Sequence, residues 1–376
     1  MHDAHQPHQD FPIDRQYDAA LQSQLDRTLR GLVDNTMRVA PVTRGLADAV
    51  SRLLVGGKRL RSRLALWAWT GYRPHDDNHR LGAIATLGAS LECFQAAALL
   101  HDDLIDRSAT RRGLPTAHIE FESLHEAEAR VGSAQQFGMA GALLAGDLAL
   151  IAAQQLVSSL FDETESGTAA SLYRVAALWH EMATEVTAGQ FLDLTAQSLP
   201  NWGVNPEADQ ELAFSIITAK SARYSVELPL VMGAALAGAD TVEQERIAAF
   251  GRPLGEAFQL RDDLLGVFGD PVVTGKPSGD DIREGKRTLL MAMTAQRADC
   301  ADRDRLIAIL GRLDVSDADV RWVCSLVRDL DAHTSVEELI ADRYDAAMSA
   351  LSQCRLTDQA RTRLVELAEA LVKRDT

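Results

Sequence analysis

The chain is poor in cysteine and in positive charge, and both shortages narrow the class of protein. Its four cysteines, Cys93, Cys300, Cys324 and Cys354, form no Cys-x-x-Cys pair and no metal-ligand spacing, so we interpret them as reduced thiols of a cytoplasmic protein. Lysine and arginine total 38 against 54 aspartate and glutamate residues, which gives a formal net charge of −16. This acidity argues against a nucleic-acid partner, because contacts to phosphate backbones come mainly from basic surfaces.

No apolar run in the sequence is long and clean enough to predict a transmembrane segment. The most apolar stretch, FGMAGALLAGDLALIAAQQL (137–156), carries Asp147 near its middle and ends in two glutamines and a leucine. It therefore falls short of the roughly 20 apolar residues that span a bilayer, and it predicts a buried helix. The N-terminal segment has no apolar signal core, so we expect residues 1–18 to form a disordered tail.

Strand patterns are also lacking, and helical periodicity recurs along the whole chain. In SLYRVAALWHEMATEVTAGQFLDL (171–194), apolar residues repeat every three or four positions, which is typical of a helix. Glycine and proline cluster at 56–57, 199–206 and 269–281, where helices are expected to end. No linker divides the chain. The sequence predicts an all-α protein with a single large helical-bundle domain over residues 19–376.

The stretch HDDLIDRSATRRGLPTAH (101–118) concentrates negative and then positive charge within a few helical turns. Asp102 and Asp106 are four residues apart and share one face of a helix, and Asp103 adds a third carboxylate beside them. Like charges at this spacing repel, and the apolar residues before them predict burial. A bound cation offsets both costs. Mg²⁺ fits, because it takes hard oxygen ligands from one or two carboxylates plus substrate phosphates.

A second acidic pair lies far downstream in AFQLRDDLLGVFGD (257–270). Asp262 and Asp263 again follow an apolar helical run. One such pair is compatible with a solvated helix face. Two pairs, each followed by a loop that carries arginine or lysine, favour a metal site built from both.

Basic residues gather around the two acidic pairs. Arg111 and Arg112 follow the first pair, where Gly113 and Pro115 are expected to end the helix, and arginine is well suited to bind phosphate through two hydrogen bonds. GGKRLRSRL (56–64) opens another helix with glycines and cations, a pattern that favours anion binding. Three further lysines, Lys220, Lys276 and Lys286, adjoin helix breakers or the second acidic pair. Together these residues predict two polyanionic ligands, one of them a diphosphate polarised by metal.

The motifs GGKRLR, DDLID, RRG, GQFLDL, KS, FQLRDD, GDPVVTGK and GKRT occur in an order that resembles the trans-isoprenyl diphosphate synthases, most closely those bacterial members that make geranylgeranyl diphosphate. The resemblance covers Leu53 to Leu290. It implies an isoprenoid-synthase bundle with a central active-site cavity and about three Mg²⁺ ions per site, which Mn²⁺ can replace. It also implies a homodimer that condenses isopentenyl diphosphate with an allylic diphosphate. The allylic diphosphate would ionise, the isopentenyl double bond would attack, and the departing diphosphate would take the proton.

The same resemblance assigns residues to roles. Metal binding falls to Asp102, Asp106 and Asp262, and the catalytic set comprises these three with Asp103, Arg111 and Lys220. The allylic diphosphate would contact Arg111, Lys220, Ser221, Gln259, Lys276 and Lys286. The isopentenyl diphosphate would contact Gly57, Lys58, Arg61, Gln95 and Arg112. Gly189 and Gln190 would face the reacting carbons.

Two positions depart from the family pattern. Gly266 stands where many relatives carry the last aspartate of the second motif, and Asp270, Asp280 and Asp281 are near enough in sequence to supply a carboxylate instead. Ser221 stands where threonine is common, and it keeps the hydroxyl.

Product length in this family depends on the helix that precedes the first aspartates. Ala97 and Ala98 lie about one helical turn before Asp102, where relatives that make farnesyl diphosphate tend to carry an aromatic residue. Phe94, one turn further, is the expected floor of the pocket. We therefore expect a twenty-carbon product, with farnesyl or longer products and an ordinary core role for Phe94 as the alternatives.

Two rival functions share parts of this pattern. A class I terpene cyclase has the helical fold and one aspartate motif, but it has no use for the residues of GGKRLR and RRG. A non-catalytic regulatory subunit of a heteromeric synthase usually loses the aspartates that this chain keeps. The apolar stretch at 142–153 is a candidate homodimer interface or, alternatively, core within one subunit.

Overall fold

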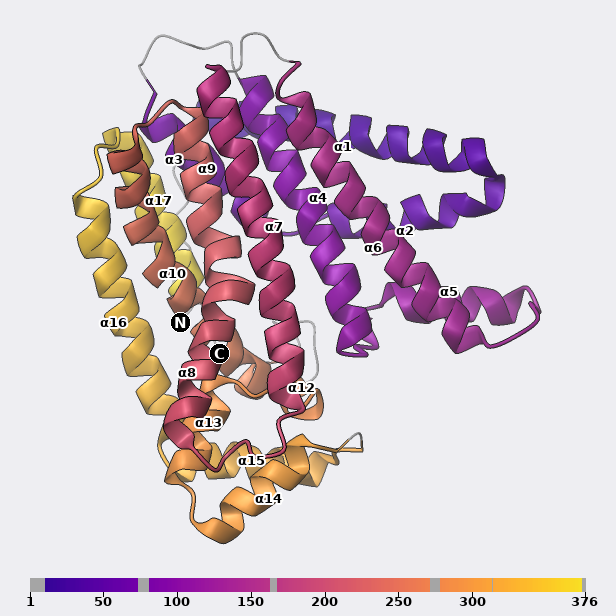
Figure 1. Cartoon of the computed structure of the whole chain (residues 1–376), viewed down its shortest axis with the longest axis vertical. Helices are drawn as coiled ribbons and strands as arrows, with labels where there is room; N and C mark the ends of the chain where they lie inside the picture. The colour runs from indigo at the N-terminus through magenta and orange to yellow at the C-terminus, as the bar shows by residue number, and fades with distance from the viewer. Residues whose placement is uncertain (1–10, 74–80, 163–167, 271–277, 313, 374–376) are drawn as a thin grey trace, which may run out of the picture.

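The computed structural model describes residues 11–73, 81–162, 168–270, 278–312 and 314–373 (Figure 1). The first half of the chain forms α1 (Pro12–Val39), the 3₁₀-helix η1 (Pro41–Thr43), α2 (Arg44–Leu54), α3 (Leu60–Gly71), α4 (Leu81–Ile105), α5 (Ala117–Ala127), α6 (Ala134–Ser159) and α7 (Ala169–Gln197). The second half forms α8 (Pro206–Ile216), the π-helix η2 (Ile217–Glu227), α9 (Leu228–Leu236), α10 (Thr241–Phe268), α12 (Asp280–Arg283), α13 (Leu289–Arg297), α14 (Cys300–Leu310), α15 (Asp317–Asp329), α16 (Ala332–Ser352) and α17 (Asp358–Val372). The prediction of an all-α fold is confirmed.

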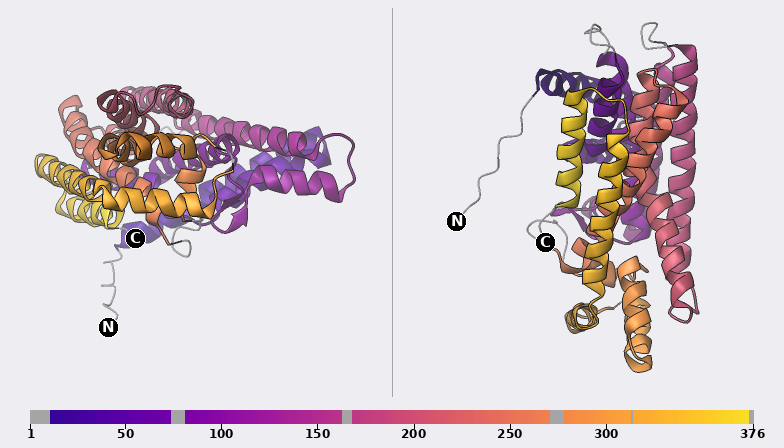
Figure 2. Two further views of the ribbon diagram at one scale, coloured as in Figure 1. Left: turned by 90° about the horizontal axis from the view of Figure 1, so that it is seen from below. Right: turned by 90° about the vertical axis from the view of Figure 1, so that its left-hand side faces the viewer.

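Helices α4, α7 and α16 run roughly along the long axis of the molecule and α1 crosses it (Figure 1), and one apolar core joins these helices. Buried apolar side chains from Tyr17 in α1 to Val372 in α17 form a single cluster. Helices α16 and α17 cover one side of the bundle, and α14 and α15 lie across its lower end (Figures 1 and 2). The segment η2 (Ile217–Glu227) packs against both α7 and α10, so residues that are far apart in the sequence meet there.

Two helices, α4 and α6, are long and apolar enough to cross a membrane by length and composition alone. The most apolar window of α4 is 78% buried in the bundle, as expected of a core helix, whereas that of α6 is only 44% buried. The prediction that 137–156 is a buried helix is therefore wrong for one face of α6. Four large side chains on that face, Met139, Leu143, Leu144 and Ile151, are 47–52% exposed.

The N-terminal tail is shorter than predicted. Residues 1–10 lie outside the described residues, but α1 begins at Pro12 and Tyr17 is fully buried. The Tyr17 hydroxyl donates a hydrogen bond of 3.1 Å to the Ser62 carbonyl, and Asp14 is bound by Arg363. The prediction of disorder through residue 18 is wrong from Pro12 onward, because apolar residues four apart, Tyr17, Leu21 and Leu25, dock α1 on the core.

A small β-hairpin replaces the predicted end of the aspartate-bearing helix. Helix α4 ends at Ile105, not near Gly113, and strands β1 (Thr110–Arg111) and β2 (Leu114–Pro115) pair in antiparallel fashion. Arg112 and Gly113 form the two-residue loop, and both have positive φ angles, 52° and 75°. Such a loop matches the twist of paired strands. The hairpin fixes Arg111 and Arg112 close to the end of α4.

The π-helix η2 requires glycine in the helices on either side of it. A Cβ on Gly189 of α7 would lie 2.6 Å from the Lys220 nitrogen, and a Cβ on Gly255 of α10 would lie 2.5 Å from the Ala222 carbonyl oxygen. Side chains at these positions would force the backbones apart. The close approach sets Lys220 of η2 against α7, and π-helical segments are frequent at functional sites.

Candidate active site

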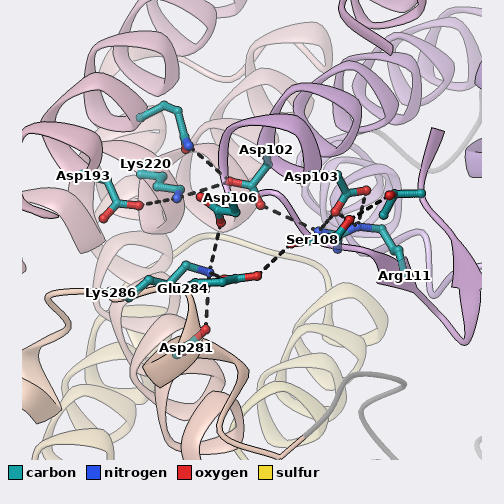
Figure 3. A network of polar contacts seen from close by, with 12 residues as sticks. Asp102, Asp103, Asp106, Ser108, Arg111, Asp193, Lys220, Asp281, Glu284 and Lys286 are labelled. Atoms are coloured by element: carbon teal, nitrogen blue, oxygen red, sulfur yellow. Dashed lines mark hydrogen bonds and ion pairs between the residues drawn. The ribbon is translucent and has the colours of Figure 1, made fainter. Parts of the chain in front are cut away.

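The first acidic motif ends α4, and two lysines from distant helices contact it. The Asp106 nitrogen bonds to the Asp102 carbonyl at 2.8 Å, so the two carboxylates share the last helical turn. Lys220 Nζ lies 3.4 Å from Asp102 Oδ1, and Lys286 Nζ lies 3.2 Å from Asp106 Oδ2 (Figure 3). A lysine therefore lies beside each of the two metal ligands predicted in the first motif.

Burial and opposite charge shift the pKa values of these groups. Burial raises the pKa of Asp106 to about 6, with Lys286 opposing the shift and Asp102 adding to it. Burial by itself would lower the pKa of Lys220, but the carboxylates of Asp102 and Asp193 raise it above its ordinary value. The same balance, with Asp281, Asp106 and Glu284 as the anions, raises the pKa of Lys286 well above its ordinary value. Both lysines are thus held as cations.

Asp103 points to Arg111 and is bound on both oxygens. Arg111 Nε donates to Asp103 Oδ1 and Oδ2 at 2.7 and 2.9 Å, and its Nη2 lies 3.7 Å from Asp102 Oδ2 (Figure 3). Asp103 is only 4% exposed. This geometry gives Asp103 the task of orienting the Arg111 guanidinium beside the first motif.

The second acidic motif lines a small cavity together with Lys220 and Lys286, the two lysines that contact the first motif. Asp262 is exposed, whereas Asp263 is buried and accepts a hydrogen bond of 2.8 Å from Gln259 Nε2. The cavity measures about 70 Å³, and among the residues that line it are Asp193, Lys220, Ser221, Gln259, Asp262, Asp263, Asp281, Lys286, Arg287 and Thr288. Of the residues predicted to bind the allylic diphosphate, Lys220, Ser221, Gln259 and Lys286 therefore meet here. Lys276 lies outside the described residues.

The glycine that breaks the second motif makes room for another carboxylate. A Cβ at Gly266 would overlap Asp281 Oδ2, and Asp281 lines the cavity. Asp281 Oδ1 is 3.3 Å from Lys286 Nζ. Of the three aspartates near enough in sequence to compensate for Gly266, Asp281 is the one whose carboxylate occupies the space beside it.

Glu284 joins the two halves of the site. It lies 2.6 Å from Lys286 Nζ through Oε2 and accepts a hydrogen bond of 2.7 Å from Ser108 Oγ through Oε1 (Figure 3). Ser108 follows α4, whereas Glu284 follows α12. This contact therefore ties the loop after the first motif to the segment that carries Lys286.

The residues predicted for isopentenyl diphosphate form two groups. Near the start of α3, Arg112 donates to the Val55 carbonyl at 3.4 Å, and a Cβ on Gly57 would lie 3.0 Å from Arg112 Nη2. Lys58, the next residue, is exposed. In the second group, Arg61 lies over the Tyr224 ring at 4.0 Å and donates to Ser225 Oγ at 2.7 Å, while Tyr224 donates to Gln95 Oε1.

Sequence reasoning missed several of these partners. Asp193 pairs with Lys220 at 2.5 Å and lies three residues after Gln190, which donates to Asp102 Oδ1 at 3.2 Å. Their i, i+3 spacing on α7 is the signal that places both on one helix face. Tyr224 follows Lys220 by four residues, but an aromatic residue at that spacing also fits an ordinary core helix.

The predicted floor residues lie in an aromatic cluster. Phe94 is 4% exposed, and its ring centroid lies 5.7 Å from that of Trp179 in α7 and 5.4 Å from that of Tyr224, both in edge-to-face geometry. Ala97 is buried and Ala98 is partly buried against the core. Phe94 is thus backed by Trp179, a contact that the sequence did not predict.

The donor set fits Mg²⁺. Asp106 Oδ2 is buried and makes no hydrogen bond with any residue that the structure describes, although it is paired with Lys286. Within the described part of the chain, no three ligating side chains gather into a ready-made cage. Mg²⁺ needs no such cage, because it combines one or two carboxylates with substrate phosphates and water. Asp262 supplies a carboxylate in the cavity wall, and Asp102 and Asp106 supply two more beside its lysines Lys220 and Lys286.

Comparison with known proteins agrees with this geometry. The chain matches the polyprenyl synthetase family model over residues 43–327. A geranylfarnesyl diphosphate synthase of Aeropyrum pernix is 30% identical over 83% of this chain and 88% of its own, and a geranylgeranyl diphosphate synthase of Sulfolobus acidocaldarius is 27% identical over 76% and 79%. A geranylgeranyl pyrophosphate synthase of Corynebacterium glutamicum, solved with isoprenyl diphosphate and magnesium, has a TM-score of 0.87 at 34% identity, covering 96% of this chain and 99% of that one. The chain belongs to the polyprenyl synthetase family and is a trans-prenyltransferase.

Proposed function

We propose that the protein condenses isopentenyl diphosphate with an allylic diphosphate, head to tail and in trans, to make geranylgeranyl diphosphate. The observation that carries the proposal is the paired charge arrangement around one cavity. Asp262 lines it together with Lys220 and Lys286, and these two lysines pair with Asp102 and Asp106. Carboxylates for metal and cations for phosphate are therefore both within reach of one diphosphate group.

The residues of the cavity would favour departure of the allylic diphosphate. Asp102, Asp106 and Asp262 would hold about three Mg²⁺ ions per site, and bound Mg²⁺, or Mn²⁺ in its place, neutralises charge that develops on a leaving diphosphate. Lys220 and Lys286 would turn from their carboxylates to the diphosphate oxygens, and Arg111, held by Asp103, would add a third cation. Fixed cations stabilise a departing anion without reorganising at the moment of reaction.

The second substrate would bind where basic residues meet the start of α3. Arg112 beside Gly57, with exposed Lys58, would hold the diphosphate of isopentenyl diphosphate. Arg61 and Gln95, joined through Tyr224, would line the approach to the reacting carbons. The diphosphate released from the allylic substrate would accept the proton lost after the new bond forms.

The twenty-carbon product rests on the residues before the first motif. Ala97 and Ala98 leave space one turn below Asp102, and the next turn presents Phe94, backed by Trp179. A helical turn rises about 5.4 Å, and one isoprene unit extends about as far. The relative from A. pernix is named for a product one isoprene unit longer. Farnesyl diphosphate and products longer than twenty carbons are the alternatives.

A homodimer in the cytoplasm is the proposed state of the enzyme. Met139, Leu143 and Ile151 repeat at multiples of four on the exposed face of α6, with Leu144 beside them. An apolar stripe of this kind suits the same stripe of a second copy across a two-fold axis. The lipid diphosphate product would be passed to membrane-associated enzymes.

A product assay tests this proposal. The purified protein alone would receive Mg²⁺, isopentenyl diphosphate and each allylic primer in turn, and mass spectrometry would size the products. We expect Mg²⁺-dependent consumption of isopentenyl diphosphate and a dominant twenty-carbon diphosphate. A product of another length would keep the chemistry and overturn the pocket assignment, and no condensation with any primer would favour the regulatory-subunit or cyclase function.

A further inference from the structure

Arg287, directly after Lys286, is a buried cation that no step described above uses. Its side chain is only 6% exposed. Two guanidinium nitrogens, Nε and Nη1, are buried and make no hydrogen bond with any residue in the described ranges. Arginine has five N–H donors in a fixed fork, so most of this fork is without a polar partner.

The surroundings of Arg287 hold the side chain without satisfying it. Its guanidinium carbon lies 4.6 Å from the centroid of the Trp202 ring, a cation–π contact. The negative charge of Asp209 attracts the Arg287 guanidinium. The Asp209 carboxylate, however, already accepts a hydrogen bond of 2.8 Å from the Gly203 nitrogen. Burial lowers the pKa of Arg287 to about 10, so it stays charged at neutral pH. Two buried guanidinium nitrogens without hydrogen bonds are costly, and an anionic ligand would remove that cost.

The position of Arg287 indicates which anionic ligand it would bind. It lines the 70 Å³ cavity together with Lys220, Ser221 and Lys286, the residues expected to contact the allylic diphosphate. Thr288, also in the cavity wall, caps α13 by accepting a hydrogen bond from the Met291 nitrogen. Helix α13 therefore begins at the cavity, and its N-terminal end adds positive potential there.

We propose that Arg287 is a further binding residue for the allylic diphosphate, and that its guanidinium finds its hydrogen-bond partners only when the diphosphate enters the cavity. The inference rests on the function proposed above and extends it to one more side chain. Arginine suits the task because its planar fork matches phosphate oxygens in pairs. The contact with the Trp202 ring restrains the guanidinium in the absence of the ligand.

The proposal predicts that replacing Arg287 weakens ligand binding and does not lower the stability of the ligand-free protein. In Arg287→Met, the affinity for inorganic pyrophosphate with Mg²⁺, measured by calorimetry, should fall at least about tenfold, the loss expected for one charge-assisted hydrogen bond. The melting temperature of the ligand-free variant should not fall, because the substitution removes a buried charge that lacks hydrogen bonds. Arg287→Lys should keep part of the affinity.

Arg283→Met is the matched control. Arg283 lies four residues earlier and is paired with Asp317 at 2.7 Å, and it does not line the cavity. This control loses the same charge, so its pyrophosphate affinity should stay within about twofold of the parent protein. An equal loss of affinity in both variants would show a general effect of net charge and would overturn the proposal.

Steady-state kinetics distinguish the two diphosphates. Arg287→Met should raise KM for the allylic substrate and leave KM for isopentenyl diphosphate unchanged. A lower melting temperature with unchanged pyrophosphate affinity and allylic KM would make Arg287 a structural anchor for Trp202 and overturn the inference. If the parent protein itself binds no pyrophosphate with Mg²⁺, the proposed function fails, which is a different outcome from the failure of Arg287 alone.

Discussion

Helices α4 and α6 have the same mean hydropathy, 1.5 over their most apolar windows, but the fold uses them differently. Helix α4 is buried for most of its length, carries Asp102 in its last turn and is followed directly by Asp106, and each of these aspartates lies beside a lysine. Helix α6 buries a stripe of alanines and exposes Leu143, Leu144 and others. Mean hydropathy alone therefore does not distinguish a helix that carries active-site residues from a helix with an exposed apolar face. The position of the carboxylates along each helix does distinguish the two.

The largest effect on catalysis should come from removing the negative charge of a single carboxylate at the end of α4. Asp106→Asn should lower kcat by about 10²- to 10³-fold, the usual cost of losing one group that stabilises transition-state charge. Steady-state assays with an allylic primer measure this. Asp147→Asn is the matched control, because Asp147 interrupts the apolar run of α6 and is half exposed near His101. A comparable loss in that variant would remove the distinction between the two helices.

A charge on the exposed face of α6 should break assembly and leave the fold intact. Leu144→Glu should weaken self-association at least about tenfold, because it places a charge in an apolar interface. Analytical ultracentrifugation across a concentration series measures the dissociation constant, and circular dichroism checks the helical content. Val131→Glu is the control, since Val131 is almost fully exposed just before α6. An unchanged dimer in Leu144→Glu would place the interface elsewhere.

A cavity opened within α4 should change the product and the stability together. Phe94→Ala should lengthen the dominant product by one isoprene unit, because a helical turn and a unit both span about 5.4 Å. It should also cost about 3–5 kcal/mol of unfolding free energy, since Phe94 packs on Trp179 and Tyr224. Mass spectrometry and chemical denaturation measure the two effects. A product no longer than that of the parent protein would contradict the floor assignment.

The smallest predicted effect is the release of a proton from Asp106, at the end of α4, when Mg²⁺ binds. Asp106 has a pKa of about 6 in the folded protein, raised by burial, against 3.8 in the unfolded chain. Between these two pKa values the folded state therefore binds more protons than the unfolded chain. Protonation of this carboxyl raises the free energy of unfolding of the metal-free protein as the pH falls through about 6. Mg²⁺ must displace that proton. Calorimetry of Mg²⁺ binding in two buffers should show release of about half a proton at pH 6 and almost none at pH 8.

The contrast between the helices also shows how far the sequence predicts this molecule. The four-residue spacing of Asp102 and Asp106 placed both carboxylates on one helix face, and the motifs assigned Lys220 and Lys286 to the same ligand. The contacts of Lys220 with Asp193 and of Lys286 with Glu284 were not predicted. Lys220 and Asp193 are 27 residues apart on different helices, and no local pattern encodes such packing.

One local error and one open alternative have equally local causes. The end of α4 was predicted at Gly113, but Arg112 and Gly113 both adopt positive φ in a hairpin that closes after Ile105. Gly113 was interpreted as a helix terminator, although glycine serves a hairpin turn as well. For α6 the sequence leaves a homodimer interface and core within one subunit open at 142–153, because apolar side chains suit both equally.

A structure of the protein with Mg²⁺ and inorganic pyrophosphate tests the central claim most directly. The account predicts metal between the carboxylates of Asp102 and Asp106, with Lys220 and Lys286 turned from those carboxylates to the pyrophosphate oxygens. Pyrophosphate bound away from the cavity, with both lysines still paired to the aspartates, would contradict it.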